Sequence, residues 1–228
     1  MFVACNFNLK SVNDTISCLI FPCLLLLMIS SLSAELIINQ KILQKINQQY
    51  GNTAMNRAIA WRKLLITVKQ VKDDKKKLTL INDFFNQKID FVNDIDHWQK
   101  KDYWATPLEF VASGAGDCED FAIAKYFSLL ATGVAEEKLR ITYVKAIKQK
   151  QAHMVLTYFA TPQAIPLVLD NLIPQIKKAT KRKDLIPVYS FNGSGLWLAK
   201  LKGSGQRVGN SKRLSLWQNL KLKIDNGK

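Results

Sequence analysis

Three side chains of this sequence could together perform nucleophilic chemistry: Cys118, His153 and Asp170. A cysteine thiolate attacks carbonyl carbon, an imidazole takes up and returns the proton, and a carboxylate holds the imidazole in one orientation. The chain order Cys, His, Asp suits a nucleophile on a helix with its two partners on neighbouring strands. The elements around each residue decide whether the three can meet.

Cys118 is predicted to lie in the first turn of a buried helix. A turn built from Gly114 and Gly116 is followed by Asp117, a favoured N-cap residue. A run without proline or glycine then follows, and its apolar residues suit a buried helix. The unpaired N–H groups and the positive end of the helix dipole at this position favour a thiolate.

Three carboxylates crowd the same turn and act in the opposite direction, because negative charge raises the pKa of a neighbouring thiol. They belong to Asp117, Glu119 and Asp120. A reactive thiol at this position therefore requires a compensating positive charge. The alternative interpretation is that Cys118 is a small buried apolar residue and that the acids only cap the helix.

His153 is one of only two histidines and lies on a predicted strand that precedes Thr161 and Pro162, while Asp170 lies on the strand that follows. In an antiparallel hairpin centred between Thr161 and Pro162, His153 and Asp170 would be direct cross-strand neighbours. A one-residue slip would place them on opposite faces of the sheet. The alternative is a structural histidine, with Asp170 capping the turn at Asn171.

The remaining sequence predicts an α+β fold with helices first and an antiparallel sheet later. Apolar periodicity indicates helices over 35–71, interrupted at Gly51 and Asn52, and over about 78–92. We predict one domain over 35–202 and a loose basic tail over 203–228, with a weakly amphipathic piece around 214–222. The predicted strands cover residues 139–143, 153–158, 167–169, 188–191 and 196–200.

The segment 93–107 is rich in polar and aromatic residues, among them Trp98, Tyr103 and Trp104. It could form a cleft wall that seats a peptide beside the cysteine, or its aromatic side chains could simply cover the helix. At its end, Thr106 and Pro107 predict the start of a short helix that leads to the glycine turn.

Residues 1–34 have the pattern of an export signal, with Lys10 before an apolar run at 16–29 and small residues before Glu35. An uncleaved membrane anchor is the alternative, since the leading region is only weakly basic. Three of the four cysteines lie within this signal, so Cys118 is the one thiol left in the mature chain. An exported protein that keeps a single cysteine favours a nucleophile, although a spare buried thiol is the alternative.

The net charge of +15 is spread along the 228 residues, apart from basic runs at 75–77 and 177–183. An exported protein with dispersed basic residues is not expected to bind nucleic acid. Anionic lipid head groups or an acidic protein surface fit this charge better.

The whole mature chain resembles the bacterial transglutaminase-like cysteine proteases of the LapG type. The stretches that carry this resemblance follow the family's order through the chain. They are Asp-Tyr-Trp-Ala-Thr-Pro (102–107), Gly-Asp-Cys-Glu-Asp-Phe-Ala-Ile-Ala-Lys-Tyr (116–126), His-Met-Val-Leu (153–156), Leu-Val-Leu-Asp-Asn-Leu (167–172) and Ser-Phe-Asn (190–192).

The resemblance implies a papain-like or transglutaminase-like fold and a periplasmic, calcium-dependent endopeptidase. Such a protease clips the N-terminal region of a large surface adhesin next to a pair of alanines and so promotes release from a biofilm. It also implies an inner-membrane receptor for cyclic di-GMP that holds the protease inactive.

Carried over by position, the resemblance makes Cys118 the nucleophile, His153 the base and Asp170 its orienter. It also implies that Asp117, Glu119 and Asp120 are calcium ligands. Hard carboxylate oxygens suit Ca²⁺, and the ion would provide the positive charge that the thiol requires. Three carboxylates are too few for a shell of about 6–8 oxygens, and Asp102 is a candidate for the additional acid.

Two alternative functions stay open at this stage. A transglutaminase shares the triad but resolves the thioester with an amine, so amine incorporation into a protein would distinguish it from a protease. A non-catalytic periplasmic binding module would use calcium and the basic surface for docking, and its activity in cells would be insensitive to Cys118→Ser.

Overall fold

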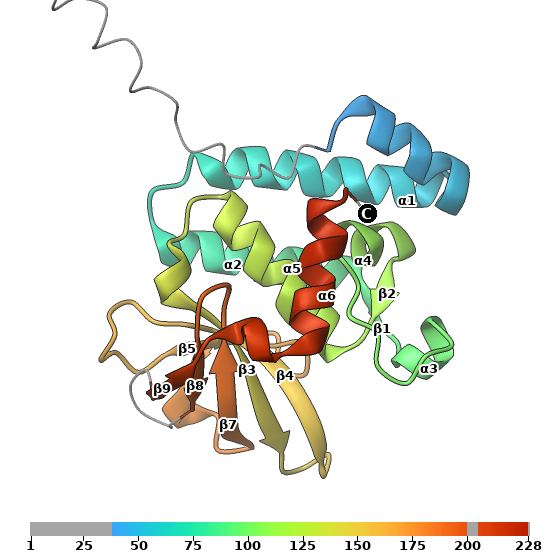
Figure 1. The fold of residues 1–228 in the computed structure, drawn as a ribbon. Helices are drawn as coiled ribbons and strands as arrows, with labels where there is room; N and C mark the ends of the chain where they lie inside the picture. The colour runs from blue at the N-terminus through green and yellow to red at the C-terminus, as the bar shows by residue number, and fades with distance from the viewer. Residues whose placement is uncertain (1–37, 200–204, 228) are drawn as a thin grey trace, which may run out of the picture. The chain divides into compact units, whose positions relative to one another are not determined.

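The structure, a computed structural model, describes residues 38–199 and 205–227. In this part of the chain, a group of helices packs against a seven-stranded antiparallel sheet (Figure 1). The predicted α+β class is therefore confirmed. The predicted export signal at 1–34 lies outside the described residues. Among the described helices, none is long and apolar enough to cross a bilayer.

The central element is α5, which begins at Cys118 and packs against neighbouring helices and against the sheet. Its side chains are buried on almost every side, and Ser128 accepts a hydrogen bond of 3.0 Å from the indole N–H of Trp61 in α1. Helix α1 is kinked at Gly51, as predicted. The helices are α1 (Gln40–Lys69), α2 (Asp74–Lys88), α3 (Asp94–His97), α4 (Pro107–Ser113), α5 (Cys118–Ala131) and α6 (Ser215–Asp225).

A short connection with two glycines leads from α4 into α5. Gly114 ends α4 with a φ of +80°, and a side chain there would collide with the guanidinium of Arg57, which binds the carbonyl oxygens at the end of α4. At Gly116 a Cβ would meet the carboxylate of Asp120 and the ring of Phe110. Both glycines are therefore needed for the chain to turn closely into Cys118. The predicted start of α4 is confirmed by a capping box at its N-terminus.

The sheet has the strand order β6-β5-β4-β3-β7-β8-β9, and every neighbouring pair is antiparallel. Strands β3 and β4 lie against α5, so the start of that helix faces the middle of the sheet. A separate pair, β1 (Asp90–Phe91) and β2 (Ala115–Gly116), is parallel and sits just before α5. The strands of the large sheet are β3 (Leu139–Ala146), β4 (Gln151–Tyr158), β5 (Leu167–Leu169), β6 (Lys177–Lys178), β7 (Leu185–Phe191), β8 (Leu196–Leu198) and β9 (Gln206–Gly209).

The hairpin of β4 and β5 differs from the predicted register by two positions. Leu156 pairs with Leu169, so the centre of the hairpin lies between Pro162 and Gln163 and not one residue earlier. The reason is that Pro162 occupies the second position of its turn, where its fixed φ is favoured. Asp170 follows the last residue of β5 and is not directly opposite His153. Because the shift is even, the two residues keep the same face of the sheet.

Residues 205–227, the described part of the predicted tail, are not the loose segment that the sequence suggested. Strand β9 pairs with β8 and extends the sheet, and α6 packs against the domain. Trp217 of α6 is fully buried, with its ring 5.3 Å from that of Phe191 and 5.7 Å from that of Tyr126. The amphipathic piece expected around 214–222 is the helix that makes this contact, and burial of its apolar side explains why it is ordered against the domain.

Candidate active site

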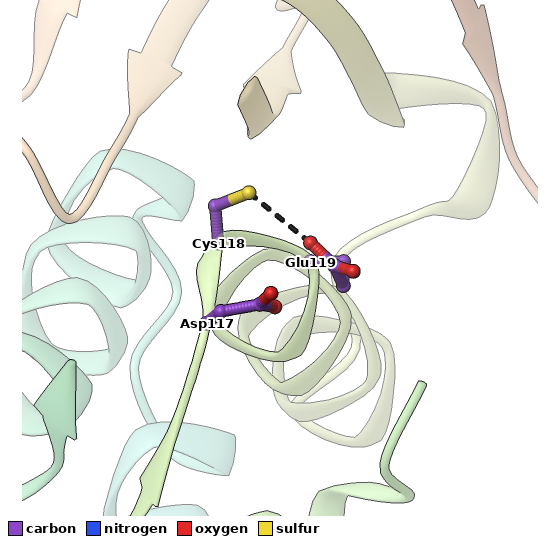
Figure 2. Close-up of side chains that lie close together, drawn as sticks. All are labelled: Asp117, Cys118 and Glu119. Atoms are coloured by element: carbon purple, nitrogen blue, oxygen red, sulfur yellow. Dashed lines mark hydrogen bonds between the residues drawn. The ribbon is translucent and has the colours of Figure 1, made fainter. Parts of the chain in front are cut away.

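The thiol of Cys118 lies at the first residue of α5, as the sequence predicted. Its sulfur donates a hydrogen bond of 3.1 Å to a carboxylate oxygen of Glu119 (Figure 2). Burial, followed by the charges of Glu119 and Asp117, holds the pKa of the Cys118 thiol well above its usual value. The backbone N–H of Met154 also contacts the sulfur and acts in the opposite direction. In this structure the acidic turn therefore keeps the thiol protonated.

Asp117 occupies the N-cap position of α5 but does not cap the helix through its side chain. One of its carboxylate oxygens is buried without a hydrogen-bond partner. The side chain lies beside those of Cys118 and Glu119, and the three offer ligand atoms within 4.8 Å of one another (Figure 2). The capping alternative therefore does not account for Asp117.

His153 and Asp170 meet across β4 and the end of β5. The Nε2–H of His153 donates a hydrogen bond of 2.7 Å to Oδ1 of Asp170, and both side chains are almost completely buried. The same Oδ1 accepts the backbone N–H of Leu172 at 3.1 Å, so Asp170 also forms the turn cap that was the alternative to the dyad. Since Nε2 is bound to Asp170, Nδ1 of His153 is the nitrogen available to another group.

A buried arginine completes the surroundings of Asp170. Arg182 donates to Oδ2 of Asp170 at 2.6 Å and also binds Asp184. Burial raises the pKa of the Asp170 carboxyl, but the hydrogen bond and charge of His153, followed by those of Arg182, hold that pKa below its usual value. Asp170 is therefore ionised at neutral pH.

Cys118 and His153 line the same cleft, whose volume is about 430 Å³. Met154, which contacts the thiol sulfur, directly follows His153 on β4, so the strand that carries the histidine passes beside the thiol. The acids at 102, 117 and 119 also line the cleft. Its apolar walls come from Phe91, Trp104, Tyr143, Tyr189 and Leu216.

The segment 93–107 contributes one of its three named aromatic residues to the wall of the cleft. Trp104 lines the cleft and is at the same time buried against Phe191, with ring centroids 5.9 Å apart. Trp98 and Tyr103 pack against each other at 4.8 Å and are not among the residues that line the cleft. Leu216 belongs to α6, so the segment predicted as a tail contributes a wall of the cleft.

Five acids gather at the start of α5. Oxygens of Asp94, Asp117 and Asp120 lie within 4.8 Å of one another, and a second group brings Asp94 together with Asp102 and Glu119 within the same limit. Asp94 is the member that sequence reasoning missed. The only signal for it was its position in the polar segment 93–107, which showed no periodicity that would mark it.

The acidic cluster has the features of a cation site. Asp94, Asp117 and Asp120 each have one buried carboxylate oxygen without a hydrogen-bond partner. Over residues 38–199 and 205–227, no lysine or arginine forms an ion pair with any of the five acids. Hard oxygen donors and excess negative charge of this kind suit Ca²⁺.

Burial and neighbouring negative charge raise the pKa values of these acids. Burial, followed by the charge of Glu119, raises the pKa of Asp117 to about 9. Burial also raises the pKa of Asp94, and it raises that of Asp120 well above its usual value although the Ala105 N–H donates to this carboxylate. Burial and mutual repulsion of the carboxylates therefore favour a proton or a bound cation at this position.

Comparison with known proteins identifies the fold and the family. The family model of the bacterial transglutaminase-like cysteine proteinases matches residues 48–198. A solved structure of LapG from Legionella pneumophila is 44% identical, covers 81% of this chain and 96% of its own, and superposes with a TM-score of 0.70. A search of the curated proteins found no match.

Two further LapG structures from Legionella pneumophila differ in their metal content. The calcium-bound structure is 44% identical, covers 81% of this chain and 98% of its own, and has a TM-score of 0.69. The EGTA-treated structure has the same identity, covers 81% of this chain and 96% of its own, and has a TM-score of 0.71. The present chain belongs to the bacterial transglutaminase-like cysteine proteinases, and it is a cysteine protease of the LapG type.

Proposed function

We propose that this protein is a calcium-dependent endopeptidase of the periplasm that cleaves the N-terminal region of a large surface adhesin near a pair of alanines. The observation that carries the proposal is one cleft in which a helix-start thiol and a histidine bound to an aspartate adjoin a cluster of acids with unpartnered oxygens. Family membership supports the protease chemistry.

In the proposed triad, Cys118 is the nucleophile, His153 is the general base and acid, and Asp170 orients the imidazole. The hydrogen bond from His153 Nε2 to Asp170 leaves Nδ1 to exchange a proton with the thiol. Backbone N–H at the start of α5 is in position to stabilise the oxyanion, because these groups have no partner within the helix.

The reaction then has two halves. The thiolate attacks the scissile carbonyl carbon, the C–N bond breaks, and His153 gives its proton to the leaving amine, which leaves a thioester on Cys118. His153 next removes a proton from water, the resulting hydroxide attacks the thioester, and the C–S bond breaks. The products are two peptides and the free thiolate with protonated His153, as at the start.

Calcium is proposed to bind among Asp117, Glu119 and Asp120, the ligands expected from the sequence, together with Asp94 and Asp102. Bound calcium supplies positive charge that offsets the carboxylates beside the thiol and so favours the thiolate. The calcium-bound LapG of Legionella pneumophila supports the choice of metal. The buried unpartnered oxygens of this chain support the position.

The compartment and the partners follow from the resemblance and from the export signal expected at 1–34. A periplasmic protease would meet the N-terminal part of a large surface adhesin, and its cut would promote release from the biofilm. An inner-membrane receptor for cyclic di-GMP would control this step by sequestering the protease. Such a receptor has to cover the cleft or block access to it.

The test uses the full chain, expressed with its signal and purified from the periplasm. It is incubated with an N-terminal fragment of a co-exported adhesin that contains two adjacent alanines, either with calcium or with a calcium-selective chelator. We expect cleavage only with calcium and only when Cys118 is intact. Cys118→Ser, which preserves the size of the side chain, is the matched variant.

Cleavage that persists in Cys118→Ser would exclude the proposed nucleophile, and equal cleavage with chelator would exclude the role of calcium. A second arm adds a primary amine and a protein that contains accessible glutamine. Incorporation of the amine without hydrolysis would instead indicate a transglutaminase.

A further inference from the structure

Arg182 is a buried charge that the proposed mechanism does not use. Only 1% of its side chain is exposed, although arginine is rarely buried unless it is paired. Arg182 lies in the connection between β6 and β7, and its side chain binds Asp170, the residue that is hydrogen-bonded to His153. Removing a guanidinium from water has a large cost, so a buried arginine at this position calls for an explanation.

The guanidinium bridges two carboxylates. Nη2 donates to Oδ2 of Asp170 at 2.6 Å and to Oδ2 of Asp184 at 2.7 Å, while Nε donates to both oxygens of Asp184 at 3.0 and 3.2 Å. Asp184 thus holds the guanidinium of Arg182 in one orientation, and Arg182 in turn holds Oδ2 of Asp170. The chain of contacts runs from Asp184 through Arg182 and Asp170 to His153.

Asp170 needs such support because the sheet does not hold it. Strand β5 ends at Leu169, and the ladder with β4 ends there too. The main chain of Asp170 is held through its carbonyl oxygen, which accepts from Asn86 at 2.8 Å and from the buried Lys125 at 3.2 Å. On the side chain, Oδ1 accepts from His153 and from the backbone N–H of Leu172, and the partner found for Oδ2 is Arg182.

The charges of Arg182, Asp170 and Asp184 also bear on the charge that His153 carries during the reaction. Arg182, Asp170 and Asp184 together carry a net charge of −1 next to His153, while burial lowers the pKa of the neighbouring Lys125 to about 7. The imidazolium that forms during the reaction therefore still faces negative charge, while Oδ2 of Asp170 does not lie buried without a partner. An arginine paired with Asp170 alone would cancel the charge that the imidazolium requires.

We infer that Arg182, anchored by Asp184, is a positioning residue for the catalytic dyad, which holds the Asp170 carboxylate in the rotamer that orients His153. This inference rests on the proposed triad. In the proposed mechanism Arg182 contacts neither the substrate nor the thiol, so it affects the reaction only through Asp170. A residue that acts in this way should affect the turnover number and leave substrate binding unchanged.

The experiment compares kcat and KM for cleavage of the adhesin fragment by the full chain and its variants. Arg182→Met should lower kcat about 10- to 100-fold with KM unchanged, the range seen when outer partners of other sites are removed. Arg182→Lys should recover part of this loss, because an ammonium keeps the charge without the fork. Asp184→Asn should lower kcat less, in the same direction.

A double-mutant cycle separates positioning from general destabilisation. In an Asp170→Asn background, Arg182→Met should cause little further loss, since its only route to the reaction is already broken. Lys77→Met is the matched control, because it also removes a buried cation, one that binds the carbonyl oxygen of Thr132 at the far end of α5. It should lower the melting temperature and leave kcat intact.

Each outcome decides a point. A folded Arg182→Met with full kcat, additive losses in the cycle, or an equal loss in Lys77→Met would overturn the positioning role. Should Arg182→Met not fold, the partly exposed Asp184→Asn decides, and full kcat there would overturn the role. Unimpaired turnover in Asp170→Asn, or no cleavage by the parent protein, would instead overturn the proposed function on which the inference rests.

Discussion

Replacing Asp94 by asparagine should stabilise the calcium-free protein and weaken calcium binding at the same time. Asp94 is 3% exposed and adds charge to a cluster that already contains Asp117 and Asp120. Its Oδ2 accepts the backbone N–H of Tyr103, and its Oδ1 has no partner. An asparagine can keep the first contact through its oxygen and turn its NH₂ toward the neighbouring carboxylates.

The magnitude follows from the distances in the cluster. Two unit charges no more than 4.8 Å apart repel by at least about 3.5 kcal/mol at an effective dielectric constant of 20. The raised pKa of Asp117, and of Asp120, means that protons already relieve much of this repulsion at neutral pH. We therefore expect a net gain of about 1–2 kcal/mol without calcium, which corresponds to a rise in Tm of roughly 2–8 °C for a domain of this size.

With calcium the sign reverses, because one charged ligand is lost. The Kd for calcium should rise about 10- to 100-fold, equivalent to about 1.4–2.7 kcal/mol. The free energy of unfolding that calcium binding adds should shrink by a similar number of kcal/mol, so calcium should raise the Tm of the variant less than that of the parent. The variant should therefore be more stable than the parent in chelator and less responsive to calcium.

Thermal unfolding in chelator and across a calcium titration measures both effects, and titration calorimetry gives the Kd independently. Asp96→Asn is the matched control, since Asp96 lies on the same short helix α3 but is exposed and belongs to none of the acidic groups. It should change neither quantity. An unchanged calcium affinity in Asp94→Asn, or a lower Tm in chelator, would refute the placement of Asp94 in a repelling, cation-binding cluster.

Three further predictions concern the same fold. In chelator, the free energy of unfolding should fall as pH rises from about 5 to 8, since folded Asp117 (pKa about 9) keeps a proton that the same aspartate in the unfolded chain, with its usual pKa of 3.8, has released. The slope is at most about 1.4 kcal/mol per pH unit for each proton, and denaturant titrations should show that it vanishes with saturating calcium. Trp217→Ala should lower the free energy of unfolding by about 3–5 kcal/mol, because Trp217 is fully buried, while Leu222→Ala on the exposed side of α6 should change it by about 0.5 kcal/mol or less; equal effects would contradict the docking of α6. Gly116→Ala should lower both Tm and calcium affinity, since its Cβ would displace the Asp120 carboxylate, and a variant that binds calcium like the parent would contradict this contact.

The sequence by itself determined the position of the thiol and the helix that carries it. The signals for this element lie within a few consecutive residues: a glycine turn, an N-cap residue and an uninterrupted apolar run before Gly133. Local conformational preference and burial both favour the same helix start, so tertiary packing did not have to override either. The capping box at the start of α4 was predictable for the same reason.

The pairing of His153 with Asp170 was predicted with the right partners and a different register. Hydrophobic alternation fixes which face of a strand is buried, and an even shift leaves that face unchanged. The position of Pro162 within its turn set the final register, and this depends on the conformation of the loop. The tail was misjudged because a helix as short as α6 acquires its stability only from the surface on which it packs.

Only the tertiary structure decided the second layer of the site. Asp94 joins the acids of α5, and Arg182 reaches Asp170, because the packing of helices and sheet brings separate segments together. Neither residue is marked by periodicity, by a cap or by its neighbours in the sequence. An acid in a polar segment or an arginine in a basic run is ordinarily solvated, and its burial beside a partner depends on contacts between segments that no local pattern encodes.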